Sequence, residues 1–474
     1  MPTNAAVSLS VKRLAPWLVA VAFFMESLDT TILNTAVPVV AKALGVTVLS
    51  MKSVLASYTL SLAVFIPISG WMADRFGTRR VFASAIGLFT FGSLLCGLTS
   101  NINVLVAYRI LQGAGGAMMM PVGRLTLVRT FPKSELVRAM SFVAVPGLVG
   151  PMLGPLAGGL IVGYLPWRAI FFLNIPIGIA GLILVYLRLP DYRAISKPLD
   201  LLGLILFGSG IALLSYVLEI FGEHALGAAE VVGLLAISLT LIFGYGLHAT
   251  HTPFPLLRLD LFRIRTFAAA VTGGFFTRLG IGGAPFLVPL LYQLGLGLTP
   301  IQSGLLIMPQ AAAAMSSKFL IPKILGRFGY RTVLVSNTVL LGLLLMLFGT
   351  ITPRTAIWII VIQAFCYGAL TSTQYTSMNT LVYADVPDAG ASNASSIAGT
   401  LQQLSISFGV ATAGLTTMLF VPERLRGNAG AVIGGLHQAF LALGAFTIVS
   451  TVAFAQLKPD DGADETHQKD IHAG

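Results

Sequence analysis

The sequence predicts an all-α membrane protein with about fourteen transmembrane helices, on three observations. Of its 474 residues, 56% are hydrophobic and only 10% are charged, whereas soluble domains carry roughly a quarter charged residues. A bilayer core about 30 Å thick needs roughly 20 apolar residues per helix, and such runs recur from Leu14 to Leu457. The alternating strands of a membrane barrel do not appear. Water is therefore not the main solvent of this chain.

The apolar runs define the expected helices in order. The first run follows Lys12 and Arg13 as in a signal peptide, but it is too long and no small-residue cleavage site follows, so we expect it to be retained. The predicted spans lie near 14–38, 53–73, 80–99, 103–128, 138–163, 168–188, 201–221, 229–249, 266–292, 302–322, 332–351, 355–382, 393–420 and 434–456.

The formal charge of +11 is explained by topology rather than by a nucleic-acid partner. When the Lys and Arg residues are assigned to alternate sides of the spans, twenty of the 29 fall on the side that holds both termini, six fall opposite and three lie within spans. Basic residues concentrate in cytoplasmic loops. We therefore expect cytoplasmic termini and a multi-pass protein of the cell inner membrane, with the lipid bilayer as its surroundings and no nucleic acid.

A weak internal repeat divides the chain into two halves. Matching segments recur at a gap of about 252 residues, drifting to 255: Phe23–Glu26 with Phe275–Arg278, Gly45 with Gly297, Arg75–Arg79 with Arg327–Arg331, Gly113 with Gly368, and Pro132 with Pro387. The spans at 201–221 and 229–249 have no partner. The predicted organisation is an N-terminus at 1–13, a six-helix bundle at 14–190, a linker with an extra transmembrane hairpin at 191–265, a second six-helix bundle at 266–457 and a cytoplasmic tail at 458–474.

A glycine-rich and basic loop follows the second span. It reads Gly70-Trp71-Met72-Ala73-Asp74-Arg75-Phe76-Gly77-Thr78-Arg79-Arg80. Gly70 permits close helix approach and Gly77 permits a tight turn, while Asp74 can pair with an arginine or a helix N-terminus of the other half. We expect Gly70, Asp74, Arg75, Gly77 and Arg79, with Arg327 and Arg331 of the repeat, to gate the cytoplasmic side. Alternatively, the basic residues serve topology alone.

The fifth span carries a stripe of small residues in Gly150-Pro151-Met152-Leu153-Gly154-Pro155-Leu156-Ala157-Gly158-Gly159. Gly150, Gly154 and Gly158 share one face, which lets a neighbouring backbone approach closely. Pro151 and Pro155 are expected to bend the helix. The stripe therefore predicts tight helix packing and contributes no chemistry of its own.

These two motifs resemble the signatures of the major facilitator superfamily. Leu28-Asp29-Thr30-Thr31-Ile32-Leu33-Asn34-Thr35-Ala36-Val37-Pro38 and Trp167-Arg168-Ala169-Ile170-Phe171-Phe172-Leu173-Asn174-Ile175-Pro176 further resemble its fourteen-helix drug:proton antiporter family. The resemblance covers nearly the whole chain. It implies a major facilitator fold of two six-helix bundles around a midplane substrate site, and export of small molecules, drugs or metabolites, driven by inward proton flow, with the proton gradient as energy source and no cofactor.

Charged residues within predicted spans are the strongest site candidates, since such groups are costly in lipid and face a cavity or a partner. Glu26 and Asp29 lie one turn apart on one helix face, and like charges this close disfavour the simultaneous ionisation of the two carboxyls. At about 1.5 Å per residue, Asp29 lies roughly 22 Å from the cytoplasmic edge and Arg109 roughly 21 Å. Arg109 belongs to Tyr108-Arg109-Ile110-Leu111-Gln112-Gly113, which resembles the family's helix 4 signature, where the arginine is implicated in proton transfer. We expect Asp29 to pair with Arg109 and to release it on protonation, with Glu26 also in proton coupling.

Arg278 occupies the repeat position equivalent to Glu26. The pseudo-two-fold axis predicts that the two form an inter-bundle contact in one state, with a static buried ion pair as the alternative. Lys318 is placed near enough to the interface to snorkel. The five intramembrane charges leave one net positive charge, which could accommodate an anionic substrate. The expected substrate cavity residues are Arg278, Asn34, Gln112, Gln293, Gln374 and Asn379, although each neutral one could instead bridge helices.

Other functional classes have less support. No phosphate-cradling loop occurs, no catalytic constellation or metal site is expected, and Cys96 and Cys366 are assigned no chemistry. Uptake by proton symport and a transport-inactive receptor or scaffold stay open as alternatives. A Gram-negative host could supply a periplasmic adaptor, but the loops reveal none.

Overall fold

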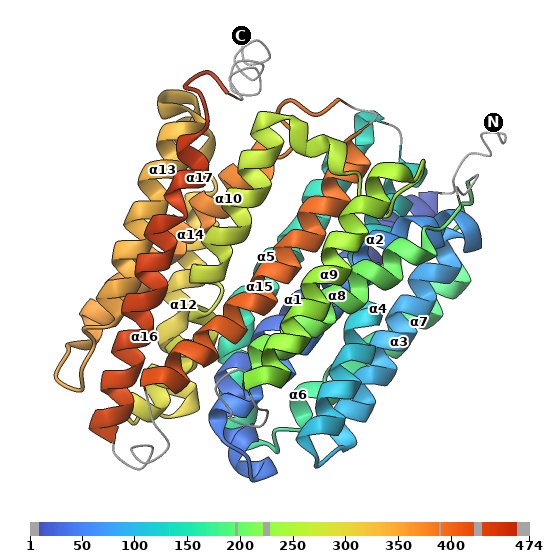
Figure 1. Ribbon diagram of the computed structural model, residues 1–474. Coiled ribbons are helices and arrows are strands. Elements are labelled where there is room, and N and C mark those ends of the chain that lie inside the picture. Colours follow the sequence, from blue (N-terminus) through green and yellow to red (C-terminus); the bar gives the residue numbers. More distant parts are fainter. Residues whose placement is uncertain are drawn as a thin grey trace. The chain divides into compact units, whose positions relative to one another are not determined.

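The computed structural model describes residues 9–131, 133–194, 198–220, 228–387, 390–420 and 429–461, and within these residues the chain is helical, without a strand (Figure 1). Residues 1–8 of the predicted N-terminus and 462–474 of the predicted tail lie outside the described residues. The chain divides into two compact units, residues Met1–Asp200 and Leu201–Gly474. The all-α class is confirmed.

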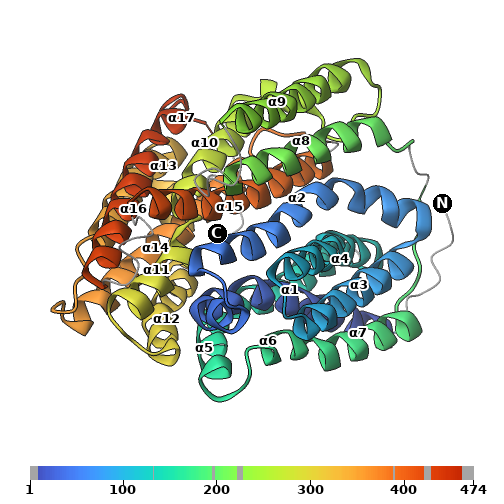
Figure 2. The same cartoon turned by 60° about the horizontal axis from the view of Figure 1, so that its bottom comes forward.

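The first unit consists of seven α-helices and one short 3₁₀ turn within its described residues. The elements are α1 (Leu9–Leu44), η1 (Val48–Ser50), α2 (Met51–Phe76), α3 (Thr78–Leu98), α4 (Ile102–Thr130), α5 (Lys133–Tyr164), α6 (Ala169–Phe172) and α7 (Asn174–Arg188). Helix α4 packs on α2 and α3, and α7 packs on α3, as Figure 2 shows. The sixth predicted span is thus two helices, which meet at Leu173.

The second unit continues the helical pattern. Its described elements are α8 (Leu201–Ile220), α9 (Ala228–His251), η2 (Leu259–Arg263), α10 (Arg265–Ile281), α11 (Ala284–Leu290), η3 (Leu291–Gly295), α12 (Pro300–Ser317), α13 (Ile321–Phe348), α14 (Ile357–Leu381), α15 (Ala391–Phe420), α16 (Ala429–Val449) and α17 (Thr451–Ala455). Helices α8 and α9 pack on each other, and α8 also contacts α15.

Ten helical segments of the described residues are long and apolar enough to cross a membrane. They are Lys12–Leu44, Val48–Phe76, Thr78–Leu98, Ala169–Arg188, Leu201–Leu218, Ala229–His251, Arg265–Gly295, Ile321–Phe348, Ile357–Leu381 and Gly430–Ala455. Helices α4, α5, α12 and α15 are not among them. Two of these four carry many polar side chains, such as Arg109 and Gln112 in α4 and Gln402 and Gln403 in α15.

The internal repeat is visible in the backbone. The four glycines of the described residues with positive φ form two pairs 252 positions apart: Gly45 (68°) with Gly297 (70°), and Gly77 (100°) with Gly329 (72°). The helix caps repeat as well. The side chain of Thr47 accepts a hydrogen bond from the backbone N–H of Ser50, and 252 positions later Thr299 accepts one from that of Gln302.

Close helix contacts recur with the same spacing. A Cβ atom at Gly113 of α4 would lie 2.7 Å from the Tyr58 carbonyl oxygen of α2. A Cβ at Gly368 of α14 would overlap the Gln310 carbonyl of α12, and Tyr58 and Gln310 are again 252 positions apart. Each unit therefore contains an equivalent helix crossing with a glycine at the contact, and these two glycines are 255 positions apart.

The glycine stripe of α5 packs against α1. A Cβ at Gly150 would overlap the Ser27 hydroxyl, one at Gly154 would overlap that of Thr31, and one at Gly158 would overlap the Ile32 carbonyl oxygen. This is the close backbone approach that the sequence predicts. Because these α1 residues flank Asp29, the stripe sets the distance between α5 and the part of α1 that carries the buried carboxylates.

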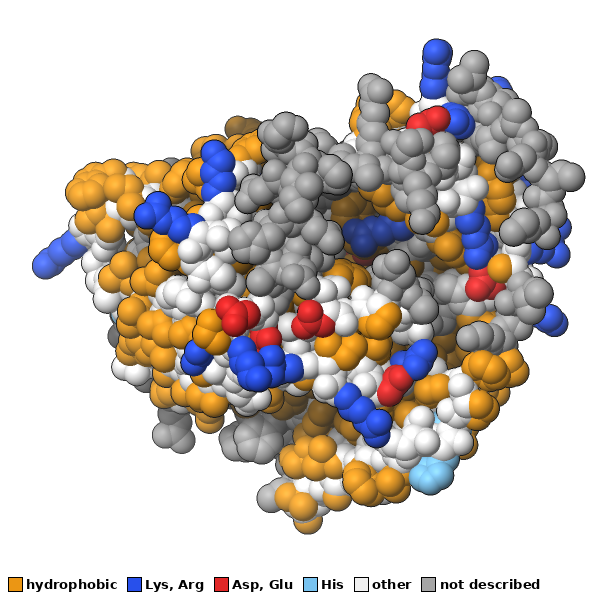
Figure 3. All heavy atoms as spheres, turned by 90° about the horizontal axis from the view of Figure 1, so that it is seen from above, with side chains coloured by type: hydrophobic (Ala, Val, Ile, Leu, Met, Phe, Trp, Pro, Cys, Tyr) orange, Lys and Arg blue, Asp and Glu red, His pale blue; other side chains and the backbone are white. Residues whose placement is uncertain are grey.

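Ion pairs outside the helix interiors lie near helix ends. In the first unit, the Lys12 ammonium is 2.9 Å from Glu135. In the second unit, Arg258 pairs with Asp260 and Arg265 pairs with Asp461. Figure 3 shows basic and acidic side chains next to one another on the face seen from above. Such exposed pairs contribute little stability individually.

Candidate functional site

The Asp29 carboxylate of α1 is the centre of a buried polar network in the first unit. Arg109 Nη1 donates to its Oδ2 at 2.5 Å. Its Oδ1 accepts hydrogen bonds from Gln112 Nε2 at 3.0 Å and from Asn174 Nδ2 at 3.1 Å. Asp29 is 2% exposed and Arg109 1%. One carboxylate thus receives donors from α4 and α7, and the pairing predicted from membrane depth is present.

Ser93 of α3 ties the donors of this network together. Its hydroxyl oxygen accepts from Gln112 at 3.2 Å and from Asn174 at 3.0 Å, and its own proton is donated to the Phe171 carbonyl at 3.0 Å. The Cys96 thiol, also on α3, lies 3.9 Å from Gln112 Oε1. The network therefore connects α1, α3, α4, α6 and α7 through side chains that are all buried.

Arg109 has further partners that offset the cost of burying its charge. Its Nε donates to the Val54 carbonyl of α2 at 3.4 Å, and Nη1 also donates to Gln112 Oε1 at 2.7 Å. The guanidinium carbon lies 4.2 Å from the centre of the Tyr58 ring and 5.9 Å from that of Phe171. Cation–π contacts strengthen when water is excluded. Arg109 is accordingly fixed in position by α1, α2 and α4.

This arrangement can respond to a single proton. The ionised Asp29 accepts three hydrogen bonds, one of them charge-assisted, and such bonds are roughly twice as strong as neutral ones. A proton on Asp29 removes the negative charge that compensates Arg109. Removing one partner of a buried ion pair costs about 3–5 kcal/mol, so the pair of Asp29 with Arg109 is a strong link between α1 and α4.

Glu26 lies one turn before Asp29 on α1. It is 6% exposed, and its Oε2 is buried without a hydrogen-bond partner in the part of the chain that the structure describes. A buried carboxylate oxygen without a donor is costly in its ionised form. The site therefore contains two unlike carboxyls: Asp29 with three donors and Glu26 with one unsatisfied oxygen.

The loop between α2 and α3 is held within the first unit. Asp74 Oδ1 accepts from Arg129 Nη2 of α4 at 2.5 Å, a partner within its own unit. The predicted contact of Asp74 with an arginine or a helix N-terminus of the other half would join the two units and stays a prediction. A Cβ at Gly70 would meet nothing within 4 Å of the described residues, so the close approach predicted there is not found. Gly77 does form the tight turn, at a φ of 100°.

Asp191, which follows α7, contacts the same loop. Its Oδ1 accepts from the Arg79 backbone N–H at 3.1 Å, and its Oδ2 lies 3.7 Å from Arg193 Nε. A Cβ at Gly77 would overlap this carboxylate. The backbone N–H of Thr78 also donates to the Tyr192 carbonyl at 2.9 Å. Residues 191–194 therefore lie across the loop and fix the start of α3.

The equivalent loop of the second unit has fewer contacts. Arg75 of the first loop is exposed, and so are Arg327 and Arg331 of the second. The guanidinium of Arg327 lies 5.6 Å from the Phe328 ring centre. A Cβ at Gly329 would come only within 3.4 Å of the Pro459 carbonyl.

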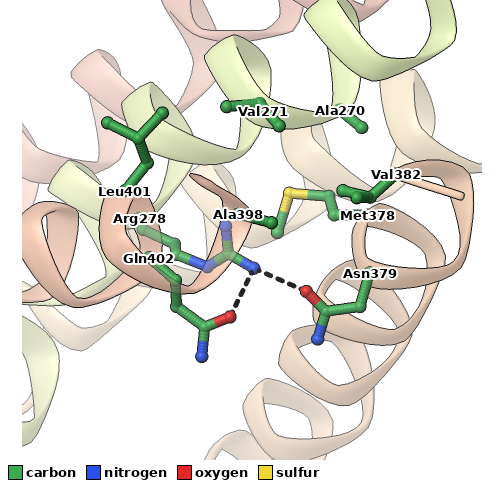
Figure 4. Close-up of a pocket in the computed structure, with 9 residues that line it drawn as sticks. All are labelled: Ala270, Val271, Arg278, Met378, Asn379, Val382, Ala398, Leu401 and Gln402. Carbon is green, nitrogen blue, oxygen red and sulfur yellow. Dashed lines mark hydrogen bonds between the residues drawn. The ribbon is translucent and has the colours of Figure 1, made fainter. Parts of the chain in front are cut away.

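Arg278 lies in the second unit near the end of α10, and it lines a small pocket with residues of α14 and α15 (Figure 4). Its Nη2 donates to Asn379 Oδ1 at 3.1 Å and to Gln402 Oε1 at 3.4 Å. The guanidinium lies 5.1 Å from the Tyr375 ring centre. Arg278 is 5% exposed, and its Nε has no hydrogen-bond partner among the residues that the structure describes. Its predicted contact with Glu26 would join the two units and stays a prediction.

The remaining predicted site residues are dispersed. Gln374 is buried and bridges helices: its Oε1 accepts from Asn337 Nδ2 of α13 at 2.8 Å, and its Nε2 donates to Thr338 Oγ1 at 2.8 Å. Asn34 and Gln293 are half-buried, the latter in the π turn after α11. Lys318 follows the last residue of α12 and is exposed, so it is not inside a helix as the span at 302–322 implied.

Sequence reasoning missed Ser93, Asn174, Arg129, Asp191 and Gln402 as site residues. Asn174 had a usable signal, because it is the single amide in an otherwise apolar stretch after Arg168. Gln402 had one too, since adjacent amides are unusual in a membrane helix. Ser93 had none, because serines are common at ordinary helix contacts in membranes.

Comparison with known proteins agrees with this architecture. Residues 19–410 match the family model described as Major Facilitator Superfamily. The chain is 39% identical over 458 residues to "Putative multidrug resistance protein MdtD" of Serratia proteamaculans (strain 568), which covers 97% of this chain and 96% of that relative. It is 41% identical over 452 residues to the protein of the same name from Escherichia coli (strain K12), covering 95% of each.

Solved structures share the fold. A D-xylose-proton symporter superposes with a TM-score of 0.68 at 15% identity, over 94% of this chain and 98% of that one. A bacterial homolog to the human lysosomal transporter Spinster does so with a TM-score of 0.65 at 16% identity, over 98% and 99%. The predicted superfamily is confirmed: the chain belongs to the Major Facilitator Superfamily and is a multi-pass membrane transporter.

Proposed function

We propose that this transporter exports small molecules from the cytoplasm by alternating access, in exchange for protons that enter through the first unit. Drugs and metabolites are the expected substrates, and the names of the relatives support multidrug efflux. The cell inner membrane is the expected location, with the proton gradient as energy source and no cofactor.

One observation carries the proton coupling. The Asp29 carboxylate is buried, accepts hydrogen bonds from three side chains and compensates Arg109. Ionisable residues inside the membrane region are costly and mark ion or proton pathways. A proton on Asp29 would release Arg109 and so alter how α1 packs against α4 and α7. The neighbouring Glu26 offers a second protonatable group one turn away.

The proposed topology has fourteen transmembrane helices, because α4, α5, α12 and α15 complete the ten apolar segments. At about 1.5 Å per residue, the 29 residues of α4 and the 30 of α15 extend over roughly 40–45 Å, more than a bilayer core of about 30 Å. Their polar residues lower their hydropathy because they line the inside of a bundle. Basic residues around Gly77 and after α7 favour a cytoplasmic location for these ends and for both termini.

Proton-driven flux in inverted membrane vesicles tests the proposal. The vesicle interior is acidified by respiration, and a panel of cationic, neutral and anionic dyes is added outside. In an exporter that exchanges protons, added substrate releases part of the proton gradient, which a pH-sensitive fluorophore reports. We expect this release with the wild-type protein and its loss in Asp29→Asn, with Asp260→Asn as an exposed control that behaves as wild type.

The same vesicles separate the alternatives. A proton symporter for uptake would move substrate out of the inverted vesicles and would concentrate it only in right-side-out ones. A receptor or scaffold would show no flux of any dye in either orientation. Undiminished proton release in Asp29→Asn would contradict the assigned role of the network.

A further inference from the structure

Arg278 of the second unit is a buried positive charge that pairs with no carboxylate among the described residues. Arg278 is 5% exposed, and within the described residues its hydrogen bonds go only to the amide oxygens of Asn379 and Gln402. This differs from Arg109, whose charge is compensated by Asp29 at 2.5 Å. An unpaired charge in a membrane-spanning region is expensive. A negative group is therefore expected at Arg278 in at least one state of the transport cycle.

The surroundings of Arg278 are suited to a carboxylate. Both amide oxygens accept from the same nitrogen, Nη2, and a carboxylate oxygen could take their place there. Figure 4 shows the amide nitrogens of Asn379 and Gln402 turned away from Arg278, and neither amide nitrogen has a hydrogen-bond partner among the described residues. Rotation of either amide would present a further donor. A guanidinium flanked by amides offers the planar, forked donor set that binds carboxylates.

The pocket also has an apolar wall and a mouth. Val271, Met378 and Leu401 line it beside Arg278. Its free space is about 10 Å³, enough for one water molecule, so a larger group must displace the amides. Asn379 is exposed and Gln402 is half-buried, which places the mouth at these two side chains. An occupant would put its charge on Arg278 and its apolar part against the wall.

The helical segment that carries Arg278, Arg265–Gly295, bends shortly after this residue. Helix α10 ends at Ile281, and α11 begins at Ala284 after the turn at Gly282 and Gly283. A Cβ at Gly282 would overlap the Arg278 carbonyl, and one at Gly283 would lie 2.6 Å from the Ala413 methyl of α15. The bend therefore lies within one turn of Arg278, next to the pocket that this side chain lines.

From these observations we infer that Arg278, with Asn379 and Gln402, binds the carboxylate of an amphipathic organic anion that the transporter carries. This inference rests on the proposed export function and adds a substrate class to it. The carboxylate replaces the two amide oxygens on the guanidinium, and the apolar body of the substrate packs against Val271, Met378 and Leu401.

Binding to the purified full-length protein in detergent tests the assignment without a proton gradient. The probes are aryl and alkyl carboxylates, led by phenylbutyrate, each compared with its amide and its amine. Ligands that bind the folded state raise Tm. We expect carboxylates alone to raise the Tm of the wild type, Arg278→Gln to weaken their binding by at least about tenfold, and Arg278→Lys to fall between. Equal shifts with amides or amines, no shift with any carboxylate, or unchanged binding in Arg278→Gln would overturn the inference.

A second variant keeps the test decisive if Arg278→Gln does not fold. Gln402→Glu places a carboxylate 3.4 Å from Arg278 with almost no change in shape. It should raise the Tm of the ligand-free protein and abolish the response to carboxylates. The neighbouring Gln403→Glu, which makes no hydrogen bond to Arg278 within the described residues, should do neither. A lower Tm in Gln402→Glu than in Gln403→Glu would contradict an empty anion site.

The outcomes separate this inference from the proposed function. Proton-driven efflux of cationic dyes, together with no carboxylate binding, would refute the anion site and leave export intact. Carboxylate binding that depends on Arg278, without proton-driven flux in vesicles, would refute export and leave the site intact. A permanent pair with Glu26 predicts that carboxylates never bind the wild type, an outcome that also overturns the inference.

Discussion

At the residue scale, the planar, forked shape of the Arg109 guanidinium matters more for the buried network than its positive charge alone. The Arg109 guanidinium contacts the Asp29 carboxylate, the Gln112 amide, the Val54 carbonyl and the Tyr58 ring at once. A lysine ammonium is a compact point charge that cannot reach all four. The fork of donors is therefore what couples α4 to both α1 and α2.

Arg109→Lys should for this reason abolish proton-coupled flux although it keeps the charge. The lost hydrogen bonds to charged groups should also lower the free energy of unfolding by about 2 kcal/mol. Proton release in inverted vesicles and Tm measure the two effects. Arg258→Lys, in an exposed ion pair with Asp260, is the matched control and should change neither. Wild-type flux in Arg109→Lys would show that charge alone suffices.

At the element scale, the spacing of α1 and α5 depends on glycines. Gly154→Ala would place a methyl group 2.8 Å from Thr31 Cβ and 3.2 Å from the Ile32 nitrogen. Overpacking of this kind costs about 1–3 kcal/mol, and it would displace the turn of α1 that holds Asp29. We expect a lower Tm and reduced flux.

Gly70→Ala provides the control for that substitution, because a Cβ there meets nothing within 4 Å of the described residues. Alanine favours a helix over glycine by about 0.5–1 kcal/mol. Gly70→Ala should therefore leave Tm unchanged or raise it. A lower Tm in this variant than in Gly154→Ala would disprove the packing argument.

The segment after α17 is attached to the start of α10. The Asp461 carboxylate accepts hydrogen bonds from the Arg265 guanidinium and from the Lys458 backbone N–H. The hydrogen bond from Arg265 lowers the pKa of Asp461 below its ordinary value. Since the folded state favours the ionised carboxyl, this attachment stabilises the protein fully above the ordinary carboxyl pKa and is lost as pH falls through the lowered value.

Asp461→Asn should accordingly lower Tm by the same amount at every pH from about 8 to 5, with the difference from wild type shrinking below about pH 4. Thermal unfolding across that pH series measures it. The adjacent Asp460 is exposed, so Asp460→Asn should follow wild type throughout. A difference that shrinks already between pH 7 and 6 would point to another titrating group.

At the scale of the whole molecule, the repeat predicts which equivalent substitutions have equal effects. Gly45 and Gly297 have nearly the same φ and open space where a Cβ would stand. Gly77 and Gly329 also share a positive φ, but only at Gly77 would a Cβ overlap a carboxylate, that of Asp191. Two glycines at equivalent positions of the repeat, both with positive φ, thus have different surroundings.

We therefore expect Gly45→Ala and Gly297→Ala to lower Tm equally, and Gly77→Ala to lower it more than Gly329→Ala. Each non-glycine residue in such a backbone conformation costs about 1–3 kcal/mol, and the overlap with Asp191 adds to that cost. Thermal unfolding of the four variants decides the matter. Equal losses at positions 77 and 329 would mean that Asp191 does not constrain the first loop.

The sequence alone predicted the helical class, the repeat and the pairing of Asp29 with Arg109, because hydropathy and depth along a helix depend on chain position. The direction in which a side chain points depends on the rotation of its helix about its axis. Packing fixes this rotation, and the sequence carries no comparable signal for it. Gln374 illustrates this, since its amide faces Asn337 and Thr338 rather than the Arg278 pocket. The roles of Asn174 and Ser93 could not be predicted for a related reason: these residues contact Asp29 and Gln112 only after five helices assemble.

The reactivity of the Cys96 thiol can report conformational changes of the first unit. It is buried beside Gln112, and thiols react only as solvated thiolates. A water-soluble alkylating reagent can therefore modify it only during intervals when solvent enters the first unit. In a Cys366→Ser background, the labelling rate of Cys96 therefore measures how often the first unit opens to solvent. Substrates or pH changes that alter the transport cycle should change this rate.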